Sequence, residues 1–188
     1  QRAINFIMKI PILNNLFSFI IRKALGLNKS RICITGAASI PKSTLEWFDR
    51  FKLKIYEAYG MSENSACSHG NYPGNIKFGT VGKAMPDTDV KITEQGEITM
   101  KNDCMMQGYF KESDLTKKTI RNGYLHTGDK GRIDEDGYLT ITGRIKDIFK
   151  TAKGKYVAPN PIEMKLSKSA FIEQVCVVGE NLTQPIAL

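Results

Sequence analysis

The sequence predicts an α/β protein with two kinds of β-sheet: a short parallel portion, then a small antiparallel, barrel-like subdomain, and finally the start of an α+β part. In the first third of the chain, strand and helix patterns alternate, which is typical of βαβ units. After Gly74, short strands with alternating polar and apolar residues recur between glycine turns, which indicates an antiparallel sheet or barrel. The 188 residues, 41% hydrophobic and 24% charged, are enough for one sizeable core, or for one domain and a piece of another.

The opening segment, residues 4–27, is apolar but is interrupted by Lys9, Pro11, Asn14 and Asn15. It therefore contains no run of the roughly 20 apolar residues that a membrane-spanning helix needs, and it lacks the pattern of a secretory signal. The segment is predicted to be an amphipathic helix.

A βαβ-like unit follows. "RICIT" (31–35) is a β-branched run closed by Gly36, and Pro41 begins a predicted helix over 41–51 with Leu45, Phe48 and Phe51 at helical spacing. "KLKI" (52–55) reads as the next strand. A parallel pair of this kind places ligand chemistry at the carboxyl ends of its strands.

Two further kinds of sequence pattern follow along the chain. Four short strands are predicted in "TDVKIT" (88–93), "GEITM" (96–100), "GYLHTGD" (123–129) and "GYLTITGR" (137–144). The segment 144–157 is rich in charge, and it is followed by a proline-started helix in "PNPIEMKLSKS" (159–169) and a last strand in "QVCVVG" (174–179).

The formal charge of +8 favours anionic ligands, and its lysines are scattered along the chain. Four cysteines lie far apart without a CxxC motif, and there are only two histidines, so a His/Cys metal cluster is not expected. Scattered cysteines of this kind indicate a reducing, intracellular environment.

The stretch "YEAYGMSE" (56–63) combines aromatic rings, a glycine, a hydroxyl and two carboxylates just after a strand. Such a group offers a flat face, a close backbone approach, a hydrogen bond for a phosphate and a metal ligand, which together suit a nucleotide. The dipeptide "YG" by itself would be explained by a turn glycine where a strand ends and a loop begins.

Four motifs in order carry a resemblance: "TGAAS" (35–39), "YEAYGMSE" (56–63), "YLHTGD" (124–129) and "GRIKDIFKTAKGKYVAPNPIE" (143–163). The chain resembles adenylate-forming enzymes, and within them the acyl-CoA synthetases of the long-chain fatty acid type. The implied fold is a large nucleotide-binding domain joined by a hinge to a small mobile domain. Residues 1–143 are expected to be the last part of the large domain, and residues 144–188 the hinge and first part of the small one.

The resemblance implies a reaction in two steps. A fatty acid carboxylate attacks the α-phosphorus of ATP to give an acyl-adenylate and pyrophosphate, and the thiol of coenzyme A then displaces AMP. The implied ligands are ATP, Mg²⁺, coenzyme A and a fatty acid. The implied nucleotide-binding residues are Gly36, Ala37, Ala38, Tyr59, Gly60, Ser62, Asp129 and Arg144.

Particular roles follow from the same resemblance. Tyr59 stacks on adenine opposite Gly36 and Ala37, and Ser62, where threonine is commoner, hydrogen-bonds the α-phosphate. Glu63 holds Mg²⁺. Ser62, Glu63 and Arg144 are therefore the expected catalytic residues.

Asp129 is expected to accept hydrogen bonds from both ribose hydroxyls, and Arg144 to contact ribose or phosphate. On their own, Asp129 would be read as a turn residue and Arg144 as a surface cation at a strand end.

Lys146 falls at the implied hinge, where an exposed polar residue suits a backbone rotation between the two half-reactions. Lys153 and Gly154 stand where many relatives carry two adjacent glycines along the coenzyme A path. Lys153 departs from that pattern, and this departure favours the long-chain fatty acyl-CoA synthetases.

The chain is expected to be a piece of a longer protein and to be inactive by itself. The loop that grips pyrophosphate and the catalytic lysine of the small domain would lie before Gln1 and beyond Leu188. Two alternatives stay open: a ligase that transfers the acyl group to a carrier protein or another acceptor, and a basic nucleic-acid-binding module. The favoured reading expects no nucleic acid partner and a cytoplasmic location, with peripheral membrane contact and oligomeric state left open.

Overall fold

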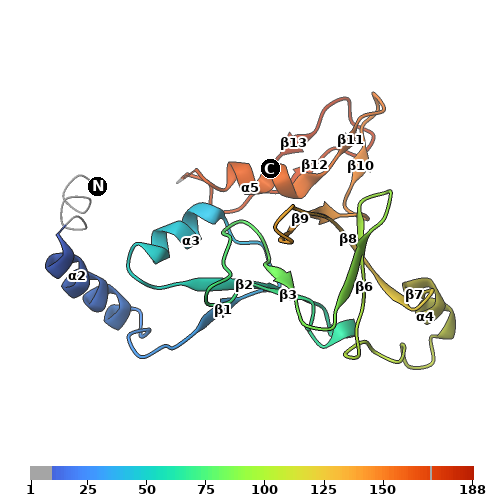
Figure 1. Ribbon diagram of the computed structural model, residues 1–188. Coiled ribbons are helices and arrows are strands. Elements are labelled where there is room, and N and C mark those ends of the chain that lie inside the picture. Colours follow the sequence, from blue (N-terminus) through green and yellow to red (C-terminus); the bar gives the residue numbers. More distant parts are fainter. Residues whose placement is uncertain (1–9, 170) are drawn as a thin grey trace.

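The computed structural model describes residues 10–169 and 171–188 (Figure 1). Its first half contains α2 (Pro11–Ala24), β1 (Cys33–Thr35), α3 (Lys42–Asp49), β2 (Ile55–Tyr59), the 3₁₀ turn η1 (Ser62–Asn64), β3 (His69–Gly70) and β4 (Lys83–Ala84). These strands form one sheet in the order β1-β2-β3-β4, in which β1 and β2 are parallel and the later pairs antiparallel. The predicted βαβ unit is confirmed.

The strand expected at "KLKI" is corrected in its position. Lys52 has a positive φ of 57° and its amide bonds Asp49 O, so the chain is still turning after α3. The strand begins at Ile55 and runs through Tyr59, so the "YEAY" of the motif is itself strand β2. Because side chains alternate along a strand, Glu57 and Tyr59 share one face.

Helix α3 covers the parallel pair through its apolar side. Leu45 is fully buried, as the helical spacing predicts, whereas Phe51, which is also buried, lies two residues beyond the end of the helix. The ring of Phe51 also contacts Phe17 of α2, with ring centroids 6.0 Å apart. The helix predicted at the start of the chain is therefore present over Pro11–Ala24, while its expected first residues, 4–9, lie outside the described part.

The second sheet is antiparallel and curled. It contains β5 (Asp89–Ile92), β6 (Glu97–Lys101), β7 (Ile120–Arg121), β8 (Tyr124–Ile133) and β9 (Leu139–Arg144), with α4 (Ser113–Thr119) before β7. The order is β5-β6-β8-β7, and β9 pairs with the other half of β8. Its core consists of four fully buried residues, Ile98, Met100, Leu125 and Leu139, and the predicted antiparallel subdomain is confirmed.

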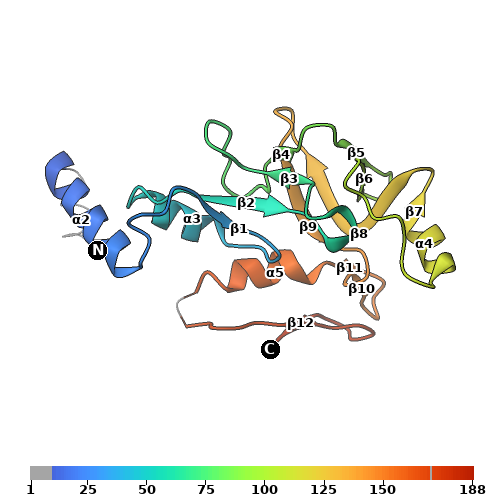
Figure 2. The same cartoon turned by 90° about the horizontal axis from the view of Figure 1, so that it is seen from below.

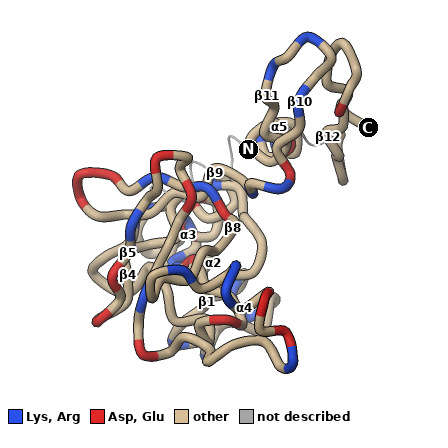
Figure 3. Tube along the Cα trace, turned by 90° about the vertical axis from the view of Figure 1, so that its right-hand side faces the viewer, with Lys and Arg blue, Asp and Glu red and all other residues tan. Residues whose placement is uncertain are grey.

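Most of the chain after β9 projects to one side of the two sheets (Figure 3). It contains β10 (Phe149–Lys150), β11 (Tyr156–Val157), α5 (Pro159–Leu166), β12 (Val177–Val178) and β13 (Ile186–Ala187). Helix α5 contacts β9 and β12, and in Figure 2 it lies below β1 and β9. The boundary at residues 143 and 144 stays a prediction. No helix in the described part of the chain is both long and apolar enough to span a bilayer.

Candidate functional site

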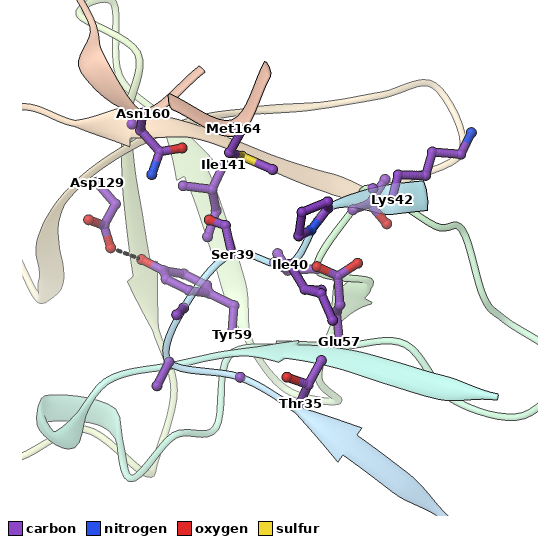
Figure 4. A pocket seen from close by; sticks show the side chains of 18 of the residues that line it. Thr35, Ser39, Ile40, Lys42, Glu57, Tyr59, Asp129, Ile141, Asn160 and Met164 are labelled. Carbon is purple, nitrogen blue, oxygen red and sulfur yellow. Dashed lines mark hydrogen bonds between the residues drawn. The ribbon is translucent and has the colours of Figure 1, made fainter. Parts of the chain in front are cut away.

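A cleft of about 760 Å³ opens where the parallel strands end. Its walls include the loop after β1, the end of β2, residues 79–81 before β4, the middle of β8 with the facing part of β9, and helix α5 (Figure 4). Strands β1 and β2 are parallel with Thr35 opposite Glu57, so both end at this edge. The cleft therefore lies where a parallel sheet is expected to place a ligand.

The loop after β1 forms one wall from small residues. A side chain at Gly36 would place its Cβ 3.0 Å from Ala58 O of β2, so the close approach of loop and strand favours glycine. Ala37 follows in the left-handed region with φ 67°. Gly36, Ala37 and Ala38 are all exposed and line the cleft.

Tyr59 and Asp129 meet across the cleft although they are 70 residues apart. The Tyr59 hydroxyl donates to Asp129 Oδ2 at 2.7 Å, as the dashed line in Figure 4 shows, and Arg144 Nε donates to Asp129 Oδ1 at 3.0 Å. Burial, and then the negative charge of Asp129, raise the pKa of Tyr59, which keeps the hydroxyl protonated. Each carboxylate oxygen can accept a further hydrogen bond, so Asp129 retains capacity for hydroxyls of a ligand.

Asp129 lies in a bulge of β8 that the Thr127 side chain holds in place. Thr127 donates its hydroxyl to Ile98 O at 2.8 Å and accepts a hydrogen bond from Asp129 N at 3.1 Å. The Asp129 side chain is only 12% exposed, whereas that of Arg144 is 60% exposed. The carboxylate is thus a fixed, buried acceptor behind an exposed guanidinium.

Glu57 is a site residue that the sequence analysis did not single out. It lies two residues before Tyr59 on the same face of β2 and lines the cleft. It is 8% exposed, and its Oε2 is buried without a hydrogen-bond partner among the described residues. Burial raises the pKa of Glu57 to about 7. The period-2 alternation with Tyr59 was the available signal, but a buried acceptor without a partner is visible only in the tertiary structure.

Ser62 and Glu63 do not line this cleft. They lie in η1, immediately beyond Gly60, which does line it. Glu63 Oε1 accepts a hydrogen bond from the Tyr109 hydroxyl at 2.8 Å, and Met106 N donates to Glu63 O at 2.7 Å. A carboxylate held through one oxygen suits a single bond to Mg²⁺ through the other. In residues 10–169 and 171–188, no group of three or more His, Cys, Asp and Glu residues could hold a metal.

The predicted hinge and coenzyme residues lie away from the cleft wall. Lys146 is exposed in the turn after β9, and Lys153 and Gly154 are exposed in the turn between β10 and β11. Their assigned roles stay predictions.

Helix α5 supplies a wall that no local pattern indicated. Asn160 and Met164 point towards the cleft from above in Figure 4, and they line it with Pro161, Lys165 and Lys168. Lys42, at the start of α3, adds another cation and lies 3.5 Å from Glu46. The cleft is therefore rimmed by cations around two buried carboxyl groups, Asp129 and Glu57.

The fold and the cleft define the class: an α/β ligand-binding protein whose site lies at the carboxyl ends of parallel strands, closed by residues of a second sheet. The family profile described as "AMP-binding enzyme" matches residues 7–110. The chain belongs to the AMP-binding enzyme family, as its four motifs predicted.

Characterised relatives agree with this assignment. The chain is 38% identical over 160 residues to long-chain-fatty-acid–CoA ligase FadD15 of Mycobacterium bovis, covering 85% of this chain and 26% of the relative. It is 38% identical over 181 residues to long-chain-fatty-acid–CoA ligase ACSBG2 of Xenopus laevis, covering 93% and 24%. The chain thus spans about a quarter of the length of these relatives.

A solved structure shares the fold. O-succinylbenzoate coenzyme A synthetase from Bacillus subtilis, in complex with ATP and magnesium ion, superposes with a TM-score of 0.74 at 24% identity. The superposition covers 87% of this chain and 38% of that protein. The chain therefore shares the fold of this synthetase.

Proposed function

We propose that this chain forms part of an enzyme that ligates a fatty acid to coenzyme A at the expense of ATP, through an acyl-adenylate. The observation that carries the proposal is the buried Asp129 carboxylate, held by Tyr59 and Arg144 opposite the Gly36 loop. This arrangement offers an aromatic face, a fixed acceptor for hydroxyls and a cation for phosphate within one cleft. The long-chain ligases among the relatives support a fatty acid as the acyl substrate.

The nucleoside binds through residues of three segments. Adenine stacks on Tyr59 with Gly36 and Ala37 along its other side, since only small residues leave room there. Glu57, with one buried oxygen unpartnered, accepts a hydrogen bond from the exocyclic amine of the base. Asp129 accepts hydrogen bonds from the ribose hydroxyls through the lone pairs that Tyr59 and Arg144 leave unused.

The phosphates lie towards η1 and Arg144. Ser62 donates to the α-phosphate, and Arg144 contributes a permanent positive charge while it remains paired with Asp129. Glu63 would hold Mg²⁺, which, when bound, offsets the charge that develops on the phosphate oxygens. The acyl carboxylate forms a bond to the α-phosphorus as the bond to pyrophosphate breaks, and the thiol sulfur of coenzyme A then bonds the acyl carbon as AMP leaves.

Residues after β9 serve the second step. Lys146 is the hinge on which the last segment turns between the half-reactions, and Lys153 and Gly154 lie along the path of coenzyme A. The four scattered cysteines support a cytoplasmic location.

The full-length protein tests the proposal. With a fatty acid, ATP and Mg²⁺ it should release pyrophosphate, and AMP release should become fast only when coenzyme A is added. AMP release that needs another acyl acceptor instead would favour the alternative ligase, and no fatty acid-dependent pyrophosphate release at all would refute the proposal.

Asp129→Ala provides the site-specific test. It should raise the apparent KM for ATP by about 10- to 100-fold, because the ribose hydroxyls lose a charged acceptor worth about 1.5 to 3 kcal/mol. Asp136→Ala, which removes an exposed carboxylate paired with Lys77, is the matched control and should leave the KM unchanged. An unaltered ATP dependence in Asp129→Ala would mean that Asp129 only holds Tyr59 and Arg144 and does not contact the ribose.

A further inference from the structure

The bulge that carries Asp129 is larger than one residue. Glu97 pairs with Lys130 and Thr99 with His126, which leaves Ile98 of β6 opposite Thr127, Gly128 and Asp129 of β8. Residues in such a bulge leave the ladder, so their amides need other partners. The partner of the Gly128 amide is a side chain: Gly128 N donates to Glu97 Oε1 at 3.1 Å.

Glu97 is itself held firmly. Its side chain is 12% exposed, and its Oε2 lies 2.8 Å from His126 Nδ1 and 3.6 Å from Arg121 Nη2. Arg121 Nη2 also lies 2.6 Å from His126 Nδ1, so both groups converge on the same carboxylate. Depending on its tautomer, His126 Nδ1 donates to Glu97 Oε2 or accepts a hydrogen bond from Arg121, while Arg121 pairs with the Glu97 carboxylate by charge at 3.6 Å.

We propose that Glu97 is a positioning residue for the nucleotide site, because its carboxylate bonds the Gly128 amide and so fixes the bulge that aims Asp129 into the cleft. The chain of contacts runs from Arg121 and His126 through Glu97 to Gly128 and then to Asp129. Gly128 is also held from its other side, since Ile145 N donates to Gly128 O at 2.8 Å. The inference rests on the proposed role of Asp129 as the ribose acceptor.

The test compares ATP with 2′-deoxy-ATP in the full-length enzyme. The unmodified enzyme should prefer ATP, because Asp129 accepts a hydrogen bond from the 2′-hydroxyl. Glu97→Ala should raise the KM for ATP by about fivefold or more, the effect of one hydrogen bond, and should reduce the preference for ATP, with a smaller change in kcat at saturating ATP.

Two conservative variants separate positioning from general stability. Glu97→Gln keeps an oxygen at the same reach for Gly128 N and should retain the preference for ATP. Glu97→Asp keeps the charge but is one methylene too short, so it should lose the preference even where its melting temperature is unchanged. Glu94→Ala, an exposed glutamate in the preceding turn, is the control.

The outcomes are distinct. An unchanged preference for ATP in Glu97→Asp, or a lost preference in Glu97→Gln, would overturn the positioning role. If Asp129→Ala itself leaves the preference for ATP unchanged, the ribose role of Asp129 fails, and with it the proposed site.

A second and independent observation concerns two cysteines. Cys67 O accepts a hydrogen bond from Asn102 Nδ2 at 2.6 Å, while Cys104 N donates to Asn102 Oδ1 at 3.1 Å, so a single amide group bridges their backbones. Ser65 Oγ also donates to Cys104 O at 3.2 Å, and Cys67 Sγ lies 3.4 Å from Ser65 O. The neighbouring Cys67 thiol raises the pKa of Cys104. Both are free thiols, Cys104 exposed and Cys67 half-buried.

The geometry points to Cys67 and Cys104 as a site of reversible disulfide formation with a peroxide as oxidant. Hydrogen peroxide oxidises one thiol to a sulfenic acid with release of water. The second thiol then attacks that sulfur, and a second water leaves as the S–S bond forms. The bond would join the segment that follows Glu63 to the segment that precedes Met106, which already bonds Glu63 O.

Peptide mass spectrometry after treatment of the folded protein with hydrogen peroxide tests this site. A peptide pair linked through Cys67 and Cys104 should form and should disappear on reduction with dithiothreitol. Cys67→Ser and Cys104→Ser should each abolish it, whereas Cys176→Ser, which removes an exposed cysteine in another element, should not. Oxidation of the two thiols without an intramolecular link, or links only between molecules, would overturn the proposal.

Discussion

At the scale of single residues, burial decides the charge of two side chains beside the cleft. Burial raises the pKa of Glu57 to about 7 and lowers that of His69 to about 4. His69 is 1% exposed and lies behind Tyr59, with ring centroids 6.2 Å apart. His69 is therefore neutral near neutral pH, whereas Glu57 is about half protonated at pH 7, so Asp129 carries most of the negative charge in the nucleoside part of the cleft.

Glu57→Gln should change the dependence of stability on pH. Because the folded state holds a proton on Glu57 that the unfolded state releases between pH 4.5 and about 7, the unmodified protein loses stability as pH rises through that window. Glutamine does not titrate, so the stability advantage of the variant should grow by roughly 2 kcal/mol from pH 5 to pH 7.5. The contribution of His69 is common to both proteins and cancels.

Urea denaturation of both proteins at the two pH values measures this difference. A stability difference that is the same at both pH values would show that Glu57 titrates normally in the folded state.

Glu63→Gln should abolish adenylation in the full-length enzyme. Glutamine keeps an oxygen that can accept the Tyr109 hydroxyl but removes the charge that binds Mg²⁺, so fatty acid-dependent pyrophosphate release should fall by orders of magnitude. Tyr109→Phe, which removes that hydrogen bond and leaves the charge, should have the smaller effect. Pyrophosphate release that is unchanged in Glu63→Gln would remove Glu63 from the site.

At the scale of elements, the cleft depends on how closely the loop after β1 approaches β2. Parallel pairing brings Thr35 beside Glu57, and the chain then turns away through Gly36 and the left-handed Ala37. The approach is set by backbone rather than by side chains, because Ala58 O would lie 3.0 Å from a Cβ at position 36.

Gly36→Ala should therefore move the loop and weaken nucleotide binding. The neighbouring backbone must shift by a few tenths of an ångström, which should cost about 1 to 2 kcal/mol of stability and raise the KM for ATP. Ala37→Gly is the matched control, since glycine adopts φ 67° without strain and should leave stability equal or higher. If Gly36→Ala has the stability and the KM for ATP of the unmodified protein, the loop can accommodate a Cβ at position 36.

At the scale of the whole molecule, one connection links the sheets to the last segment. The chain leaves β9 at Arg144, which holds Asp129, and passes through the exposed Lys146 before reaching α5, which forms the opposite wall of the cleft. A rotation at Lys146 would therefore move the wall formed by α5 while the nucleoside part of the site stays in place.

Lys146→Pro should separate the two half-reactions in the full-length enzyme. Proline fixes φ near −65°, and within the described residues the Lys146 amide donates no backbone hydrogen bond that proline would remove. Acyl-adenylate should form at a near-normal rate while acyl-CoA formation falls by orders of magnitude.

Circular dichroism and melting should show an intact fold in this variant, and Lys146→Ala should keep both steps. Equal loss of both steps would indicate general damage or a direct contact with phosphate, and retention of both would refute the hinge and the boundary at residue 144.

The sequence by itself determined that a βαβ unit is followed by an antiparallel sheet, and it named Gly36, Tyr59 and Asp129, which line the cleft. Apolar periodicity is a local property, so the helix around Leu45 and the antiparallel strands could be predicted without coordinates. The four motifs, taken in order, pointed to the family and to Gly36, Tyr59 and Asp129.

Only the tertiary structure decided which of these residues meet and what surrounds them. Tyr59 and Asp129 are joined by a hydrogen bond across 70 residues, and other segments bury a Glu57 oxygen that has no hydrogen-bond partner in the described part of the chain. The Glu97 contact with Gly128 likewise depends on a bulge in strand pairing, which no local pattern specifies. The physical reason is that periodicity reports which face of an element is buried, whereas hydrogen-bond partners and burial depend on contacts between segments far apart in the chain.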